Sequence, residues 1–352
     1  MTMPPVEVLE LDVTALAAGG DGVARDSNGR VTFVPRTVPG DRVRVRITKS
    51  TSSFARGELV EVITPSEQRV APACEAFVRG CGGCQWLHVA RAAQLDAKQA
   101  IVAGALRKLD GLVVERIADP CTALGWRRRA RFHVSHGVVG LYREGSHDVV
   151  PVARCPQLEP VLDTALVAAI AGSPADGELE LACNAAGEVS IGDRVIELEP
   201  GLWASAHDFA QASAAGNAAL IALARTAAGR GPGRLLELYA GSGNFTRFFR
   251  ADGWDVTAGD VEGGGARGQL ERATGPFDLI VLDPPRTGAA EAVPGILRIA
   301  PPRVVYISCD PATLARDAER LVAGGYRAER AWPVDVMPQT AHVEVVMTLV
   351  RP

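Results

Sequence analysis

The sequence predicts a multidomain α/β protein built from a small N-terminal β-barrel, a central mixed α+β domain and a C-terminal doubly wound, Rossmann-like domain. Three observations predict this order. Residues 4–64 alternate apolar and polar side chains between glycine-containing turns, which is typical of short strands. A group of cysteines follows, and from about residue 206 apolar strands alternate with helical stretches and a glycine loop. The expected domains are 1–65, 66–205 and 206–352.

The composition excludes several protein classes. The chain has 352 residues, 47% of them hydrophobic, and a formal net charge of -4, so it is neither disordered nor globally basic. No apolar run reaches the ~20 residues that a membrane helix needs, and the first residues lack the layout of a secretion signal. We expect a cytoplasmic monomer without a membrane partner, in which the seven cysteines are reduced.

Two basic strips stand out against the acidic net charge. The first lies on one face of the predicted barrel and consists of Arg42, Arg44, Arg46 and Lys49. Taken alone, it favours a solvated polar face over a surface that binds RNA. The second strip follows Trp126 and consists of Arg127, Arg128, Arg129 and Arg131. Four arginines in five positions favour contact with the phosphates of a nucleic acid over a solvated strand edge.

Three cysteines lie close together and a fourth follows far downstream. The set is Cys74, Cys81, Cys84 and, within Arg-Cys-Pro, Cys155. This spacing, with a proline after the last cysteine, favours a [4Fe–4S] cluster over structural zinc, which more often shows two paired Cys-x-x-Cys motifs. The two glycines between Cys81 and Cys84 let the backbone wrap around such a cluster. Cys121 and Cys183 are expected to be small core residues.

A predicted strand over residues 234–239 runs into the glycine loop Ala-Gly-Ser-Gly-Asn-Phe-Thr at 240–246. Glycine at this place lets a ligand approach the backbone at the end of the strand. The acidic Glu237 and the missing third glycine of the dinucleotide fingerprint favour S-adenosylmethionine (SAM) over a dinucleotide. Asp260 ends the next strand about 20 residues on, where a carboxylate can accept the ribose hydroxyls.

Two later strands deliver reactive side chains to the same edge of the predicted sheet. The strand over 277–282 ends at Asp283, and the strand over 303–308 ends at Cys309. A cysteine at this edge, beside Asp-Pro, is predicted to be a nucleophile rather than a packed core residue. Glu344, just before the final strand, is predicted to be a general base.

Together these segments resemble the RNA uridine-5-methyltransferase family of the 23S rRNA type, and the resemblance covers nearly the whole chain. The N-terminal barrel is similar to that family's RNA-binding TRAM domain, and Cys-Gly-Gly-Cys-Gln resembles its iron–sulfur loop. Ile-Ser-Cys-Asp-Pro around Cys309 and Pro-Gln-Thr-Ala-His-Val-Glu, which ends at Glu344, resemble its nucleophile and base signatures. The resemblance implies transfer of a methyl group from SAM to C5 of a uridine in RNA.

The resemblance also implies roles for single residues. Cys309 adds to C6 of the uracil, C5 then takes the methyl group, and Glu344 removes the C5 proton. The uridine must leave its stack to reach this site. Arg286 is expected to offset negative charge that develops on the ring. The positions that match the family's cofactor and base contacts are Gln211, Tyr239, Gly241, Asn244, Asp260 and Asp283.

Three features depart from the family pattern. Six residues separate Cys74 from Cys81, one more than expected, and Ser213 stands where the family has an asparagine. Only 22 residues separate Asp260 from Asp283, which leaves no room for a full βα unit and the following helix. The sequence therefore predicts a SAM-dependent methyltransferase domain that is shortened by about one βα unit and has lost part of its adenine pocket.

Two alternatives to the main hypothesis stay open at this point. One is an RNA-binding iron–sulfur protein with weak or lost methyl transfer, which the retention of Cys309, Asp283 and Glu344 disfavours. The other is a tRNA rather than an rRNA target, which the added barrel and cysteine group disfavour.

Overall fold

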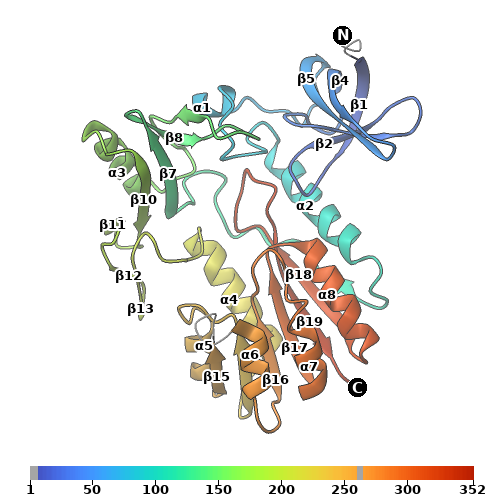
Figure 1. Cartoon of the computed structure of the whole chain (residues 1–352), viewed down its shortest axis with the longest axis vertical. Coiled ribbons are helices and arrows are strands. Elements are labelled where there is room, and N and C mark those ends of the chain that lie inside the picture. The colour runs from blue at the N-terminus through green and yellow to red at the C-terminus, as the bar shows by residue number, and fades with distance from the viewer. Residues whose placement is uncertain (1–6, 260–264) are drawn as a thin grey trace.

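The N-terminal part of the chain folds into the expected barrel. In this computed structural model, which describes residues 7–259 and 265–352, five strands close on themselves in the order β1-β2-β3-β5-β4 (Figure 1). Alternate side chains point inward and form a small buried core, as the period of two predicts. The strands are β1 (Val8–Leu16), β2 (Gly22–Arg25), β3 (Val31–Val34), β4 (Arg42–Ser50) and β5 (Phe54–Thr64).

Acidic side chains pair with the three arginines of the basic strip on the barrel. Arg44 of β4 contacts Glu10 and Glu61 on the two flanking strands. Arg46 lies 3.7 Å from Glu58. These pairs are exposed, so each adds little to stability. The three guanidinium groups therefore have partners within the protein, and RNA binding by this face stays a prediction.

The central part holds two small sheets and the cysteine-bearing loop. One sheet has five strands in the order β11-β10-β7-β8-β9 and packs on α3, and β12 pairs with β13 in a separate hairpin. The elements are α1 (Glu75–Val78), α2 (Arg91–Leu106), β6 (Val113–Val114), β7 (Arg129–Ser135), β8 (Val138–Tyr142), β9 (Val149–Pro151), α3 (Pro160–Ala171), β10 (Gly177–Cys183), β11 (Val189–Ile191), β12 (Ile196–Glu199) and β13 (Leu202–Ala204).

The C-terminal part is a doubly wound domain on a seven-stranded sheet, in the order β15-β14-β16-β17-β19-β18-β6. On β14, Leu235 belongs to the core shared with α4 and α5, whereas Leu236 belongs to the core shared with α2, α6, α7 and α8. The elements are α4 (Ala214–Ala228), β14 (Arg234–Leu238), α5 (Thr246–Ala251), β15 (Asp255–Gly259), α6 (Gly265–Arg272), β16 (Leu279–Leu282), α7 (Val293–Ile299), β17 (Arg303–Ser308), α8 (Pro311–Ala323), β18 (Arg327–Val334) and β19 (Glu344–Val350).

The two edges of this sheet differ. β15 forms one edge, and among the described residues no strand pairs with its outer side. At the other edge β6 pairs with β18, and α2 packs into the same core as α8. The stretch 66–205 therefore contributes to the C-terminal sheet as well as to its own, and the domain boundaries at 65 and 205 stay a prediction.

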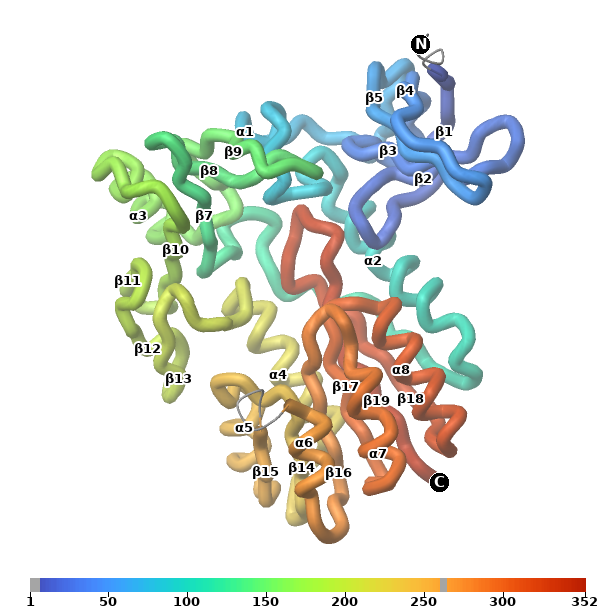
Figure 2. Tube along the Cα trace, in the orientation of Figure 1, coloured from blue at the N-terminus to red at the C-terminus, as the bar shows by residue number. Residues whose placement is uncertain are grey.

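The segment 335–343, between β18 and β19, leaves the sheet and reaches the central part of the molecule (Figure 2). There the backbone carbonyl of Gln339 accepts hydrogen bonds from the N–H groups of Gln85 and Trp86. The Trp86 indole in turn donates to the carbonyl of Gly20 in the barrel, at 2.9 Å. All three parts of the chain therefore meet near Trp86.

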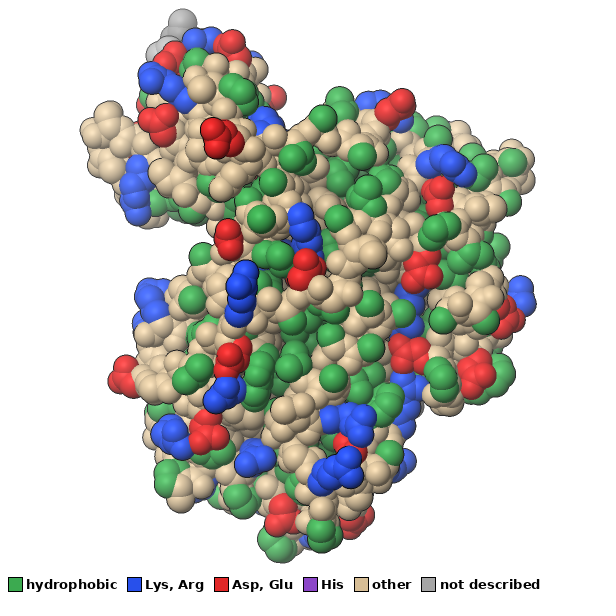
Figure 3. Space-filling model, turned by 180° about the vertical axis from the view of Figure 1, so that it is seen from behind, with side chains coloured by type: hydrophobic (Ala, Val, Ile, Leu, Met, Phe, Trp, Pro, Cys, Tyr) green, Lys and Arg blue, Asp and Glu red, His purple; other side chains and the backbone are tan. Residues whose placement is uncertain are grey.

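The surface mixes charges of both signs. On the face shown in Figure 3, Lys and Arg side chains are interspersed with Asp and Glu instead of forming one basic field. Within residues 7–259 and 265–352, no helix combines the length and the apolar character of a membrane span. The cytoplasmic localisation and the monomeric state stay predictions.

Candidate active site

Cys309 lies in the tight connection between β17 and α8. The Asp310 carboxylate caps α8 by accepting hydrogen bonds from the N–H groups of Ala312 and Thr313, each 2.9 Å long. The Ser308 hydroxyl bonds to both the N–H and the carbonyl of Asp310. These bonds fix the turn and hold Cys309 two residues before the positive end of the α8 dipole, which offsets part of the cost of ionising this half-buried thiol.

Strand register brings Glu344 beside Cys309. Ser308 of β17 pairs with Val345 of the antiparallel β19, so the next positions along the two strands are Cys309 and Glu344. Asp283 follows β16, the parallel neighbour of β17, at the same edge of the sheet. The structure thus brings together Cys309, the predicted nucleophile, Glu344, the predicted general base, and Asp283, which is predicted to contact SAM or the uracil.

Burial controls ionisation at this edge. It raises the pKa of Glu344 to about 8, with a further contribution from Asp283. It raises the pKa of Asp283 to about 7, with a contribution from Glu237. The pKa of the Cys309 thiol rises to about 11 through burial and then through the charges of Glu344 and Asp283, while Arg286 opposes the shift. A carboxyl group with a pKa near neutrality can exchange protons at physiological pH, as a general base must.

Asp317 of α8 positions the loop that follows Asp283. Its buried carboxylate accepts hydrogen bonds from the Ala289 N–H at 2.7 Å and from the Tyr306 hydroxyl at 2.9 Å. A Cβ at Gly288 would meet that carboxylate at 2.6 Å, and the φ of 77° also favours glycine there. The sequence interpretation missed Asp317, whose available signal was a carboxylate on the apolar face of a helix.

Polar side chains hold the glycine loop after β14. Tyr239 and Gly241 take left-handed backbone conformations, with φ of 59° and 52°. The Asn244 side-chain amide exchanges two hydrogen bonds, of 3.0 and 2.8 Å, with the amide of Asn217 on α4. Three of the predicted cofactor residues therefore share one loop at the carboxyl end of β14. Asn217 is an addition that the sequence interpretation did not include.

Two partly or fully buried carboxylates flank this loop. Glu237 accepts a hydrogen bond from the Thr246 hydroxyl at 2.6 Å, and burial raises its pKa to about 7. Glu199, at the end of β12, joins the central hairpin to the cofactor loop because it accepts hydrogen bonds from Arg128, Asn217 and Arg247. The pKa of Glu199 is lowered because these hydrogen bonds and the nearby Arg128 charge together outweigh the opposing effect of burial. The loop is therefore tied to the central part of the chain.

The other predicted cofactor positions lie before α4 or outside the described residues. Gln211 precedes the helix, and its backbone carbonyl accepts a hydrogen bond from Arg128 at 3.1 Å. The Ser213 hydroxyl accepts from the Gly216 N–H at 3.0 Å and caps α4, a task that asparagine also performs well. The departure from the family pattern at this position therefore keeps a capping residue. Asp260 falls outside the residues that the structure describes.

The arginines of the strip after Trp126 have partners within the protein, and their contact with RNA phosphates stays a prediction. Arg128 is only 2% exposed and pairs with Glu199. The other three donate to acceptors within the protein: Arg127 to the carbonyl of Arg129, Arg129 to the carbonyl of Ala206, and Arg131 to Glu180. Because the sequence shows charge but not partners, it could not reveal that these guanidinium groups hold the central part together.

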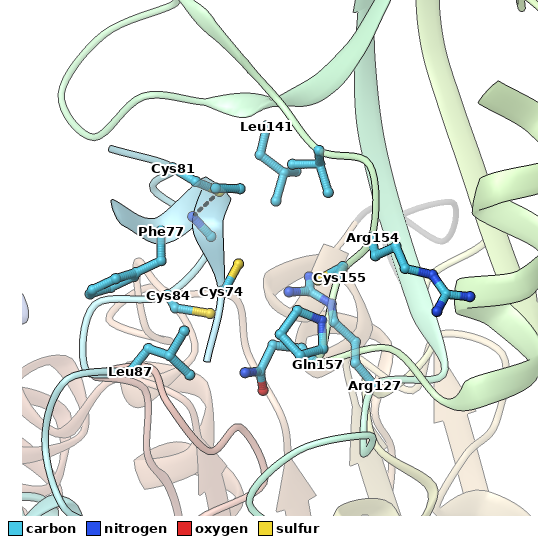
Figure 4. A pocket seen from close by; sticks show the side chains of 14 residues that line it. Cys74, Phe77, Cys81, Cys84, Leu87, Arg127, Leu141, Arg154, Cys155 and Gln157 are labelled. Atoms are coloured by element: carbon cyan, nitrogen blue, oxygen red, sulfur yellow. Dashed lines mark hydrogen bonds between the residues drawn. The ribbon is translucent and has the colours of Figure 1, made fainter. Parts of the chain in front are cut away.

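The four predicted metal-binding cysteines line one pocket (Figure 4). They come from three segments: the start of α1, the loop that follows it and the connection between β9 and α3. Arg127 and Arg154 line the same pocket and bring positive charge to it. The empty space amounts to about 410 Å³, open solvent at its mouth included. The four cysteines are Cys74, Cys81, Cys84 and Cys155.

Burial disfavours ionisation of the thiols in this pocket, so thiolates there would need a positive group beside them. Burial raises the pKa of three of the four thiols, those of Cys81, Cys84 and Cys155. A Cβ at Gly82 would lie 3.0 Å from the backbone carbonyl of Tyr142, so glycine lets the loop pack closely against that backbone. Among the described residues, no three His, Cys, Asp or Glu side chains are arranged to hold a metal ion. The structure does not confirm a metal site; it shows four thiols around one space, as a polynuclear cluster with one thiolate per iron requires.

Comparison with known proteins agrees with this arrangement. Residues 5–60 match the TRAM domain family, and residues 270–352 match the tRNA (Uracil-5-)-methyltransferase family. The chain is 32% identical to the 23S rRNA (uracil(1939)-C(5))-methyltransferase RlmD of Alkalilimnicola ehrlichii, over 99% of this chain and 97% of that protein. It is also 32% identical to the RlmD protein of Cronobacter sakazakii, over 96% and 95% of the two chains.

A solved structure supports the fold over the whole length. The tRNA (uracil-54, C5)-methyltransferase of Pyrococcus abyssi superposes with a TM-score of 0.72 at 19% identity, over 97% of this chain and 100% of that one. The alignment with the Alkalilimnicola protein spans 437 positions against the 352 residues here, so at least 85 of its positions lack a counterpart in this chain. The chain belongs to the RNA (uracil-5-)-methyltransferase family and carries a TRAM domain at its N-terminal end.

Proposed function

We propose that this chain transfers a methyl group from SAM to C5 of a uridine in 23S rRNA through a covalent cysteine adduct. The strand pairing that sets Cys309 next to Glu344, with Asp283 on the neighbouring strand, carries the proposal. The relatives of nearly full length support the target, because they are named 23S rRNA (uracil-C5)-methyltransferases.

The chemistry follows from the weakness of C5 as a nucleophile. The Cys309 thiolate adds to C6 of the flipped uracil, and the electron pair of the C5–C6 bond moves so that C5 becomes enolate-like. SAM supplies the methyl group that C5 takes. Glu344 then accepts the proton of C5, the C5–C6 double bond re-forms and the bond from C6 to the Cys309 sulfur breaks. Arg286 stabilises negative charge on the ring during the addition.

The ionisation of Glu344 and Cys309 should make turnover depend on pH. Glu344 must be a carboxylate to accept the proton, and its pKa of about 8 keeps most of it protonated at pH 7 in the free chain. The Cys309 thiol, with a pKa of about 11, also needs to lose its proton. Turnover should therefore rise with pH through 8.

The cofactor site is inferred at the carboxyl ends of β14 and β15. The proposed contacts are Tyr239, Gly241 and Asn244 in the glycine loop, together with Gln211, Asp283 and Asp260, of which the last lies outside the described residues. A carboxylate at the end of the second strand suits ribose hydroxyls, and buried acids suit the positive sulfonium of SAM.

We further propose that this half of the sheet lacks one βα unit. β15 is followed by α6 and then by β16, which pairs on the other side of β14, so no described strand extends the sheet beyond β15. The 437-position alignment is consistent with a shortened chain. Adenine would lose an apolar wall worth ~25 cal/mol per Å² of buried surface. This feature favours the second candidate function, an RNA-binding protein with weak or lost methyl transfer.

We infer that the pocket of four cysteines binds a [4Fe–4S] cluster. When bound, the cluster would cross-link the three chain segments that supply its ligands. Iron analysis and the visible spectrum of anaerobically purified protein test this: about four irons and broad visible absorption are expected, and one zinc without iron would overturn it. The variant Cys155→Ala should lose iron, whereas Cys121→Ala, a buried cysteine outside the pocket, should retain it.

Mass spectrometry of RNA tests the function. Transcripts of 23S rRNA fragments and of tRNA are incubated with the protein and SAM, digested and analysed for 5-methyluridine. The proposal expects 5-methyluridine in the rRNA fragments. Methylation of tRNA alone would replace the target, and methylation of neither, with RNA binding retained, would favour the binding-protein alternative. The proposed division of labour is RNA binding by 1–65, cluster and RNA contacts by 66–205 and catalysis by 206–352.

A further inference from the structure

We propose that Gln339 is a positioning residue for the general base, because it fixes the segment that leads to Glu344 against the cysteine-bearing loop and α2. Gln339 lies five residues before Glu344, in the segment 335–343 that leaves the sheet. The proposal rests on the proposed function, since it requires Glu344 to remove the C5 proton.

The buried Gln339 uses its backbone and both side-chain polar atoms for hydrogen bonds to other parts of the chain. Its side chain and N–H form a reciprocal pair with the Gln94 amide of α2, at 2.8 and 3.0 Å. Its Nε2 donates to the carbonyl of Ala123 at 3.1 Å, and its own carbonyl accepts from the N–H groups of Gln85 and Trp86 at 3.1 and 2.9 Å. Five hydrogen bonds therefore hold one residue in the middle of the segment.

Gln339 has a backbone conformation that is unfavourable for a residue with a Cβ. Its φ is 65°, a left-handed value that costs roughly 1–2 kcal/mol for a residue with a Cβ. Glycine or asparagine would adopt it more readily. Without the bonds to Gln94 and to the Gln85–Trp86 backbone, the segment would relax toward another conformation.

Asp335 fixes the beginning of the segment 335–343, so a change at Gln339 should affect mainly the residues that follow it. The buried Asp335 accepts a hydrogen bond from Lys98 at 2.6 Å and also contacts Arg91, both on α2. This ion-pair network holds the end of β18. The path from Asp335 to Glu344 passes through Gln339, so loss of its two side-chain hydrogen bonds loosens the part nearest the base and leaves the sheet intact. The Ala341 N–H, which donates to Gln85 at 3.4 Å, remains as a contact of that part.

The partners of Gln339 connect the base to the cysteine pocket. Gln85 follows Cys84 directly, and Trp86 is fully buried between the barrel, α2 and Ala341 of the segment. Two backbone hydrogen bonds to the Gln339 carbonyl therefore connect the cysteine-bearing loop to the segment that leads to Glu344.

The order of the chemical steps gives this role a specific signature. Addition of Cys309 to C6 and methyl transfer to C5 both precede removal of the C5 proton. A displaced Glu344 would slow only the last step, in which the C5 proton passes to the carboxylate and the sulfur leaves C6. The methylated adduct between Cys309 and RNA would then accumulate, whereas general damage to the fold would lower adduct and product together.

The test compares Gln339→Ala, Gln339→Asn and Gln99→Ala with the natural chain, with Glu344→Gln as the reference for a lost base. Gln99 is the matched control: it also bonds α2 to backbone, at Glu115 and Ile117, but does not touch the segment. Product is measured as 5-methyluridine, adduct as protein–RNA complex that survives denaturation, and folding by Tm and circular dichroism.

We expect Gln339→Ala to lower product formation by about 10- to 100-fold while the ratio of adduct to product rises at least several-fold, as in Glu344→Gln. Gln339→Asn tolerates the left-handed backbone better, but its shorter amide cannot reach both partners, so it should shift the ratio the same way through the lost side-chain bonds alone. It covers the case in which the alanine variant does not fold. An unchanged ratio in a folded Gln339 variant, or an equal shift in Gln99→Ala, overturns the proposal. If the natural chain forms neither adduct nor product, the proposed function fails first and the positioning role falls with it.

Discussion

The two halves of the C-terminal sheet differ in how deeply their strands are buried. In the half that carries Cys309 and Glu344, strand β19 is buried along its whole length except at Val350. In the half that would bind SAM, every residue of the edge strand β15 is at least partly exposed. The first half is anchored by Asp317, Gln339 and the Asp335 network, the second mainly by Glu199 and the Asn217–Asn244 pair.

This difference predicts that the chemistry and the cofactor affinity of this chain can be changed separately. The strands that place Cys309 and Glu344, the proposed nucleophile and base, are central and pair on both sides, so their geometry does not depend on β15. The cofactor loop depends on side-chain contacts with the central hairpin. Changes in the first half should therefore act on the covalent steps, and changes in the second on SAM affinity and local stability.

The largest expected effect comes from Cys309→Ala. Without the thiolate, C5 is not activated, and formation of 5-methyluridine should fall by at least about 10³-fold. RNA binding, measured by fluorescence anisotropy, should stay within about twofold because the side chain is small. Undiminished methylation by this variant would show that the buried half does not supply the nucleophile.

The next largest effect is expected from Glu199→Ala. It would leave Arg128, which is 2% exposed, as a buried charge without its carboxylate, and such losses cost about 3–5 kcal/mol. Thermal unfolding should show a lower Tm, and calorimetry a higher Kd for SAM. The matched control is Glu197→Ala on the same strand, whose exposed carboxylate should be dispensable within about 0.5 kcal/mol. Equal effects of Glu199→Ala and Glu197→Ala would show that Glu199 does not hold the cofactor loop in place.

A pH series sharpens the comparison within the buried half. The folded-state pKa of Glu344, about 8, lies above its unfolded value. Its contribution to stability is therefore fully present below the unfolded pKa and is lost as the pH rises through about 8. The free energy of unfolding, from urea titrations, should fall by on the order of 1–3 kcal/mol between pH 6 and 9. Glu344→Gln should remove this part of the slope, and an unchanged slope would contradict the assigned pKa.

The smallest expected effect concerns SAM affinity. Each ~55 Å² of apolar contact that adenine loses weakens binding about tenfold. Calorimetry on this chain and on the Alkalilimnicola relative, under identical conditions, should show a Kd for SAM that is about tenfold higher for this chain. Equal affinities would mean that the exposed edge still encloses adenine.

Much of the fold and of the reactive edge could be predicted from the sequence because the signals are local. The period of two in residues 8–64 predicts the barrel, and apolar strands that end in Asp283 and Cys309 predict where these side chains lie. The register that sets Glu344 beside Cys309 follows once both strands are assigned to neighbouring places in the sheet.

What the sequence did not reveal depends on contacts between distant parts of the chain. Nothing near Arg128 shows that Glu199 would bury it, and nothing near Gln339 shows that Gln94 and Trp86 would surround it. The membership of β6 in the C-terminal sheet rests on pairing with β18, more than 200 residues away. The sequence around a residue shows its charge and polarity, but it does not show which distant residues contact it.

The most direct test of the central claim is a covalent capture experiment. A 23S rRNA transcript containing 5-fluorouridine has no C5 proton for Glu344 to remove, so the adduct cannot resolve. Incubation with SAM should yield a protein–RNA complex that survives denaturation, with the ribonucleotide mapped to Cys309 by peptide mass spectrometry. Absence of any such complex, under conditions where the ordinary transcript becomes methylated, would contradict the account.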